Sequence, residues 1–181
     1  MVSPMLPDFK STHFELFGLP ERFELDGAQL DAAYRHLQVQ VHPDKFAHLP
    51  ESEQRVSMQW STRVNEAYQA LKTPLNRAIY LLTLHGINAL APENTQLSMT
   101  FLMQQIEWRE GIQSAQNAGD LPALQTIERE LNQAEKMTVA RLAEEMDGGK
   151  QWSVAAQTVR QLKFINKIHE EIDDSYAALD M

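Results

Sequence analysis

Hydrophobic residues recur every three or four positions through most of the chain, without the apolar–polar alternation that is typical of strands. The few glycines and prolines, 7 and 8 in number, mostly fall between these periodic segments. The pattern therefore predicts an all-α protein. The expected helices cover residues 12–17, 26–42, about 56–73, 74–86, 98 to about 117, 120 to about 147 and 153 to about 179.

The first half of the chain is predicted to form a helical hairpin. Asp26 is the expected N-cap of its first long helix, with Gln29 three residues later, and Pro43 ends that helix. Pro74 ends the second long helix, because the residue before a proline avoids helical geometry. The expected core positions are Leu30, Ala33, Tyr34, Leu37 and Val41 on the first, and Val56, Trp60, Val64, Ala67 or Tyr68, and Leu71 on the second.

The second half is predicted to form a three-helix bundle after a linker, "INALAPENTQL". Its last helix has six expected core positions: Leu162, Ile165, His169, Ile172, Tyr176 and Leu179. Phe164 and Ile168 lie off that stripe.

The first helix of the bundle carries two apolar stripes. Phe101, Trp108, Ile112 and Ala115 form the expected core stripe, and Leu102, Met103 and Ile106 form a second. Two interpretations of the second stripe stay open. Either the bundle buries two faces of the helix, or an exposed apolar patch with Glu107 and Glu110 at its rim binds a partner.

Composition narrows the function classes. The 181-residue chain has a formal net charge of −9, which argues against nucleic acid as a partner because phosphate binding needs clustered Lys and Arg. The acidity is uneven: residues 1–79 carry 8 Lys and Arg against 10 Asp and Glu, whereas residues 80–181 carry 8 against 15. No apolar run approaches the roughly 20 residues that span a bilayer, and the start of the chain lacks a signal or transit pattern. We therefore expect a cytoplasmic protein with no membrane partner.

The break between the hairpin helices contains "HPDK", residues 42–45. By itself this segment is typical of a helix C-terminus, with a proline as the stop. A second interpretation is a metal site made by His36, His42, Asp44 and His48, since a chain without cysteine must use His and carboxylate ligands. These four residues lack an established ligand spacing, so we expect no metal.

The sequence around the HPD tripeptide, residues 42–44, changes its interpretation. "HPDKF" lies between "LDAAYRHLQVQV" and "RVSMQWSTRVNEAYQALKTP", after "HFELFGL", and this arrangement resembles a J-domain. The resemblance implies a co-chaperone that engages a DnaK-like ATPase chaperone and promotes its ATP hydrolysis, without being an enzyme itself. It also implies a chaperone-binding site made by His42, Pro43 and Asp44, with Arg35 and Lys45 as its basic residues.

Further motifs resemble one family of J-proteins. "FGLP", "YLLTLHG", "TFLMQQIEWREGI" and "TVRQLKFINKI" are similar to the HscB family of iron–sulphur cluster co-chaperones. The resemblance implies that an IscU-type cluster scaffold binds the bundle and is delivered to an HscA-type chaperone. It implies no cofactor for the chain itself, and a J-domain that binds a different client is the alternative. The expected scaffold-binding residues are Leu102, Met103, Ile106, Glu107, Glu110 and Phe164. The expected domains are 11–76 for the J-domain, 77–97 for a connecting helix and linker, and 98–181 for the scaffold-binding domain.

Overall fold

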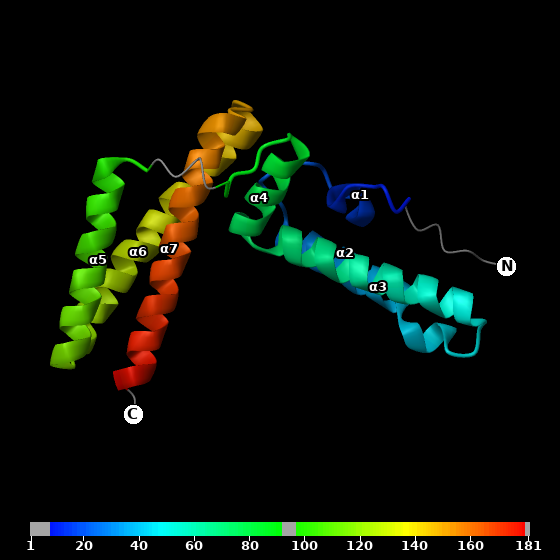
Figure 1. Cartoon of the computed structure of the whole chain (residues 1–181), viewed down its shortest axis with the longest axis horizontal. Coiled ribbons are helices and arrows are strands. Elements are labelled where there is room, and N and C mark those ends of the chain that lie inside the picture. The colour runs from blue at the N-terminus through cyan, green and yellow to red at the C-terminus, as the bar shows by residue number, and fades with distance from the viewer. Residues whose placement is uncertain (1–7, 92–96, 180–181) are drawn as a thin grey trace. The chain divides into compact units, whose positions relative to one another are not determined.

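A computed structural model describes residues 8–91 and 97–179, and all regular structure within these ranges is helical, which confirms the all-α prediction. The chain divides into two compact units, one up to Leu81 and the other from Leu82 (Figure 1). Residues 92–96 of the predicted linker lie outside the described residues. Within the described ranges, no helix combines the length and apolar character needed to cross a bilayer.

The first unit begins with the short helix α1 (His13–Phe17), whose two ends are both capped. Thr12 and Glu15 form a reciprocal capping box: the Thr12 hydroxyl accepts the Glu15 N–H at 3.2 Å, and the Glu15 carboxylate accepts the Thr12 N–H at 2.7 Å. Gly18 closes the helix at φ 64°, a left-handed conformation that glycine adopts without steric cost. The helix ends are therefore those that the sequence predicts.

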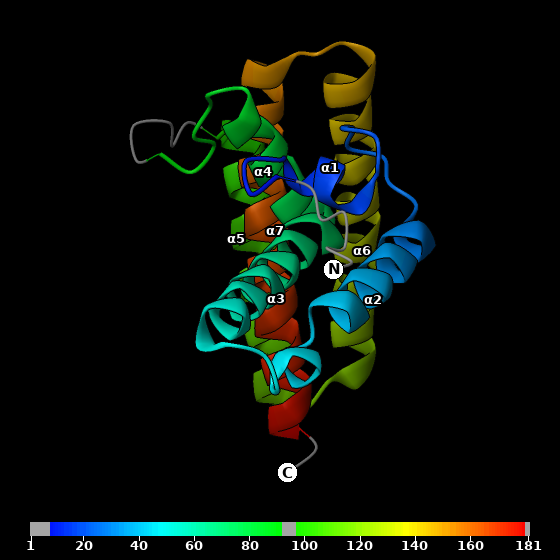
Figure 2. The ribbon, with the colours of Figure 1, turned by 90° about the vertical axis from the view of Figure 1, so that its right-hand side faces the viewer.

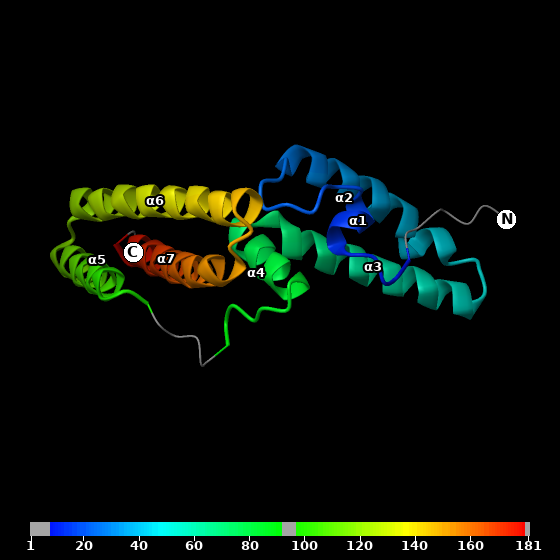
Figure 3. The ribbon, with the colours of Figure 1, turned by 90° about the horizontal axis from the view of Figure 1, so that it is seen from above.

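Two antiparallel helices, α2 (Gly27–Val41) and α3 (Glu51–Lys72), form the predicted hairpin and lie side by side in Figure 3. As predicted, Asp26 caps α2, and its carboxylate accepts the Ala28 N–H at 2.9 Å and the Gln29 N–H at 3.4 Å. Figure 2 has the closed end of the hairpin, drawn in cyan, toward the viewer. This end carries the HPD segment.

The core face of α3 differs from the prediction at one position. Trp60, Val64, Ala67 and Leu71 are buried as expected, but Val56 is 48% exposed and Ser57 is buried in its place. Ser57 tolerates burial because its hydroxyl donates a hydrogen bond of 2.8 Å to the Val41 carbonyl, near the end of α2. The apolar period alone placed Val56 in the core, and that prediction was wrong.

Helix α4 (Pro74–Leu84) starts directly after α3, where Thr73 is extended (φ −100°, ψ 148°) ahead of Pro74. The buried guanidinium of Arg77 ties this start to the first unit. Its Nε donates to the Phe23 carbonyl and its Nη1 to the Leu71 carbonyl, each at 2.6 Å. One side chain thus joins the loop before α2, the end of α3 and the beginning of α4.

The second unit contains α5 (Met99–Ala118), α6 (Leu121–Ala143) and α7 (Trp152–Leu179), which pack pairwise as the predicted bundle (Figure 1). Because α6 reverses the chain between them, α5 and α7 run in the same direction. Ile168 is fully buried in the bundle core, although the sequence placed it outside the core stripe. It is buried because α7 packs against two neighbours and therefore has two buried stripes.

A π-helical turn, η3 (Glu144–Gly148), follows α6 and was not predicted. Its buried Glu145 accepts a hydrogen bond of 3.1 Å from the Thr158 hydroxyl on α7, and burial raises the pKa of this carboxyl group. Two residues after Thr158 on α7, the Arg160 Nε donates a hydrogen bond to the Ala89 carbonyl at 2.7 Å. Residues 89 and 91, from the described part of the linker, are buried in the same unit.

Candidate functional site

The HPD segment forms a short tip on the hairpin, and His42, Pro43, Asp44 and Lys45 are exposed in it. Helix α2 ends at Val41, His42 is extended (φ −60°, ψ 126°), and Pro43 opens the 3-10 turn η1 (Pro43–Phe46). The Asp44 N–H donates to His42 Nδ1 at 3.3 Å, which fixes the imidazole against the backbone of the turn. We call residues 42–46 the HPD tip.

The carboxylate of Asp44 points into solvent. Its side chain is 89% exposed, and its Oδ2 lies 3.6 Å from His42 Nδ1, longer than a hydrogen bond. Pro43 restricts the backbone between these two side chains, so less conformational entropy is lost when a partner binds. The tip therefore presents a preorganised hydrogen-bond acceptor, and it contains no arrangement of nucleophile and base that indicates catalysis.

Two side chains of α3 support the tip, and neither was predicted from the sequence. Gln54 Nε2 donates to the Leu49 carbonyl at 2.8 Å and to the Ala47 carbonyl at 3.3 Å, so it binds the loop that follows η1. The Ser57 hydroxyl donates to the Val41 carbonyl in the last turn of α2, directly before the tip. Their only sequence signal is a polar residue close to the start of a helix, which is too common to be informative.

The predicted basic residues Arg35 and Lys45 are both exposed, the first on α2 and the second in η1. Val39 lies one turn after Arg35 and is 59% exposed, which adds an apolar contact that the sequence analysis did not consider. This side of α2 thus offers a partner one positive charge and one apolar side chain.

The metal interpretation of this segment gains no geometric support. Within residues 8–91 and 97–179, no three His, Asp or Glu side chains lie close enough to hold a metal ion. His36 instead lies beside Gln40, with their side-chain nitrogens 3.3 Å apart on the surface of α2.

The second candidate site lies on the bundle. Leu102, Met103 and Ile106 on α5 and Phe164 on α7 are 39%, 57%, 56% and 38% exposed. These four side chains are the apolar patch. A bundle that buried both stripes of α5 would cover them, so the first of the two open interpretations fails for this helix. Exposed apolar side chains that cluster in this way indicate an interaction surface.

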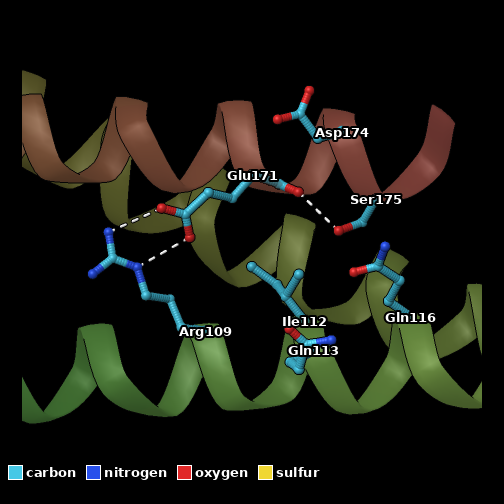
Figure 4. A pocket seen from close by; sticks show the side chains of 7 residues that line it. All are labelled: Arg109, Ile112, Gln113, Gln116, Glu171, Asp174 and Ser175. Atoms are coloured by element: carbon cyan, nitrogen blue, oxygen red, sulfur yellow. Dashed lines mark hydrogen bonds and ion pairs between the residues drawn. The ribbon is translucent and has the colours of Figure 1, made fainter. Parts of the chain in front are cut away.

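An ion pair sets the register of the two helices that carry the apolar patch. Arg109 on α5 donates through Nε and Nη2 to both carboxylate oxygens of Glu171 on α7, each at 3.0 Å (Figure 4). The helices run in parallel, so counting back seven residues, about 10 Å, from each partner brings Leu102 level with Phe164. The patch therefore bridges α5 and α7.

The two predicted acidic residues are both exposed but occupy different faces of α5. Glu110 lies seven residues after Met103, so it shares that outward face of the patch. Glu107 instead lines a groove between α5 and α6, where it accepts a hydrogen bond of 3.2 Å from Gln104 Nε2. The structure thus places Glu107 apart from Phe164, on the opposite flank of α5.

Two buried hydrogen-bond donors lie on the inner face of α5, behind the patch. Gln105 and Trp108 are both 5% exposed, and neither Gln105 Nε2 nor Trp108 Nε1 has an acceptor among the described residues. An unsatisfied buried donor costs about 1–3 kcal/mol. The burial of Gln105 was not predicted, since a polar residue on an amphipathic helix normally faces solvent.

Comparison with known proteins first defines the class of protein to which this chain belongs. A DnaJ domain model matches residues 12–80, which contain the hairpin and its HPD tip. The chain is therefore a J-domain protein, a class that acts with chaperones of the Hsp70 type.

The same comparisons identify the family. The model of the HscB C-terminal oligomerisation domain matches residues 97–173. Curated relatives described as co-chaperone protein HscB homologs include one from Azoarcus sp. (47% identity over 97% of this chain and 99% of that protein) and one from Ralstonia nicotianae (48%, over 93% and 96%). The chain belongs to the HscB family of co-chaperones, as its motifs predicted.

Solved structures agree with this assignment. The chaperone HscB from Vibrio cholerae superposes with a TM-score of 0.84 at 37% identity, over 93% of this chain and 99% of that one. Human co-chaperone protein HscB superposes with a TM-score of 0.86 at 29% identity, over 92% and 83%. The chain therefore shares with the family the combination of a hairpin unit and a helical bundle.

Proposed function

We propose that this protein binds an IscU-type iron–sulphur cluster scaffold through the apolar patch and delivers it to an HscA-type chaperone through the HPD tip. ATP hydrolysis in the chaperone then drives transfer of the cluster to recipient proteins. The observation that carries the proposal is the exposure of two unrelated surfaces on one chain, a charged turn on the hairpin and an apolar patch on the bundle.

The HPD tip is suited to regulating a partner rather than to performing chemistry. An exposed carboxylate on a restricted turn accepts a charge-assisted hydrogen bond from a partner arginine, a contact worth about 1.5–3 kcal/mol. Asp44 supplies that carboxylate, and His42 is held beside it by the backbone. Arg35 and Lys45 add attraction to an acidic chaperone surface.

The apolar patch is suited to holding a folded protein. Methionine, leucine and phenylalanine side chains with a polar rim are typical of the centre of a protein interface, where a few anchors carry most of the binding energy. The two sites lie in separate units, so one chain can contact both partners. Such bivalency raises the effective concentration of the scaffold at the chaperone.

The test is the steady-state ATPase rate of an HscA-type chaperone with this protein, with an IscU-type scaffold, and with both. We expect synergy between the two additions. Asp44→Asn should abolish the stimulation while calorimetry shows unchanged scaffold binding, and Glu53→Gln, an exposed acidic site on α3, is its matched control. Met103→Ala combined with Phe164→Ala should remove scaffold binding and synergy but leave the basal stimulation.

The alternatives give different results. Stimulation without any response to the scaffold would favour a different client for the bundle. A folded protein that stimulates neither an HscA-type nor a DnaK-type chaperone would contradict the role of the HPD tip. If both variants lost both activities while remaining folded, the two-site description would be wrong.

A further inference from the structure

The apolar patch is small for a specific protein interface. Such an interface buries about 800 Å² on each partner and involves roughly 20–30 residues on a side. Four apolar side chains and two acidic ones cannot supply that area, so a bound scaffold must also cover surface beside the patch. Two grooves flank α5, and their chemistry distinguishes them.

The groove between α5 and α7 is polar. It has a volume of about 340 Å³, and Arg109, Gln113, Gln116, Glu171, Asp174 and Ser175 line it with Ile112 (Figure 4). Its only cation is paired with both oxygens of Glu171. The Ser175 hydroxyl donates to the Glu171 carbonyl at 2.8 Å. Ile112, its one large apolar residue, is only 5% exposed. This groove offers a partner no apolar anchor.

The groove between α5 and α6 is larger, about 890 Å³, and has such an anchor. Trp108 and Ala134 line it, and Met137 on α6 also lines it with 57% of its surface exposed. Glu107, one of the predicted scaffold-binding residues, lines the same groove from α5. The groove is therefore continuous with the proposed binding surface, and Met137 has the same exposure as Met103.

The charges of this groove favour a basic partner. Arg129 turns back along its own helix, with Nε donating to the Gln125 carbonyl at 3.2 Å and Nη2 to the Thr126 hydroxyl at 3.0 Å. Glu130, which also lines the groove, has no hydrogen-bond or ion-pair partner in the described part of the chain. The lining of the groove thus carries two carboxylates, Glu107 and Glu130, against one guanidinium, Arg129, which leaves a formal charge of −1.

We propose that the scaffold-binding surface extends over α5 onto α6, with Met137 as a second apolar anchor and Glu130 as a contact for a basic side chain. The occupant is an amphipathic segment of the scaffold, which places an apolar side chain against Met137 and a lysine or arginine between Glu107 and Glu130. This inference rests on the proposed function, because it assigns further contacts to the same partner. Methionine suits the role, since its flexible thioether adapts to the shape of a partner surface.

Isothermal titration calorimetry of the full chain with a purified IscU-type scaffold tests the inference. Met137→Ala should raise the Kd about fivefold to tenfold, as expected for an interface anchor. Met58→Ala is the matched control, because Met58 is 60% exposed on α3 of the other unit and its loss should leave the Kd unchanged. Glu130→Lys should raise the Kd at low salt, and the effect should shrink at high salt as charges are screened.

The outcomes separate the inference from the proposed function. Wild-type protein that binds no scaffold at all would contradict the proposed function itself. Wild-type protein that binds, with Met103→Ala and Phe164→Ala weakening it but Met137→Ala and Glu130→Lys unchanged within twofold, would overturn the extended surface alone. If Met137→Ala altered self-association in sedimentation experiments and not the scaffold Kd, the groove would hold a second copy of this chain, which would also overturn the inference.

Discussion

Ser57→Ala removes the hydroxyl that fixes the last turn of α2, directly before the HPD tip. The side chain is 3% exposed, and its hydrogen bond to the Val41 carbonyl is 2.8 Å long. Losing the donor leaves a buried carbonyl without this partner, which costs about 1–3 kcal/mol. Alanine recovers roughly 0.5 kcal/mol through its higher helix propensity. We therefore expect the first unit to lose about 0.5–2.5 kcal/mol of its free energy of unfolding.

Hydrogen exchange followed by mass spectrometry measures this loss within one unit of the intact chain. A cost of about 0.5–2.5 kcal/mol speeds exchange from the opened state about 2- to 70-fold, and peptides from α2 and α3 should show it while peptides from α5 to α7 do not. Ser52→Ala is the matched control, because Ser52 is exposed on the same helix and its replacement changes propensity alone.

Two results would contradict a stabilising role for the Ser57 hydrogen bond. Exchange at the wild-type rate in α2 would mean that water replaces the hydroxyl without cost. The higher helix propensity of alanine should, if anything, slow exchange in Ser52→Ala, so equal acceleration in that variant would mean that the effect does not come from the lost bond to Val41.

Two further predictions concern buried polar groups. Gln105→Leu removes an unsatisfied donor at nearly constant volume, so it should raise the unfolding free energy of the bundle by about 1 kcal/mol, and chemical denaturation that shows a loss would contradict this account. Burial, followed by the charge of Arg63, lowers the pKa of His13, whose ring stacks on Tyr80 at 4.2 Å. The unfolded chain then binds the proton more readily, so the first unit should lose stability as the pH falls below 6.5 toward the lowered pKa. His13→Phe should remove that part of the pH dependence, and an unchanged pH profile in this variant would assign it to other groups.

The sequence predicted helix ends well where an end has a local chemical cause. The start of α3 has no side-chain cap, and this helix begins at Glu51 and not at about residue 56 as predicted. Asp26, Gly18 and Pro43 cap or stop a helix through their own side chains or backbone preferences, so their effect is visible without the fold. The exposed members of the apolar patch were also visible, as apolar residues beyond the number that one buried face requires.

The misplaced and missed residues depend on partners that are distant in sequence. Ser57 is buried because Val41, sixteen residues earlier, supplies an acceptor, and no property of α3 alone reveals that pairing. Ile168 is buried because α7 has a second neighbour, which a single helical stripe does not indicate. Gln54 acts on a loop whose path the sequence does not specify.

Arg77 determines where the hairpin unit can be separated from the rest of the chain. The predicted domain boundary at residue 76 would discard this guanidinium together with its bonds to the carbonyls of Phe23 and Leu71. It would also discard Tyr80, whose hydroxyl accepts the His13 N–H at 2.9 Å. A recombinant fragment that stops there would therefore lack the long-range hydrogen bonds made by Arg77 and Tyr80. One that continues beyond Leu81 keeps both, so a protease that trims the isolated unit should leave its most resistant end within α4.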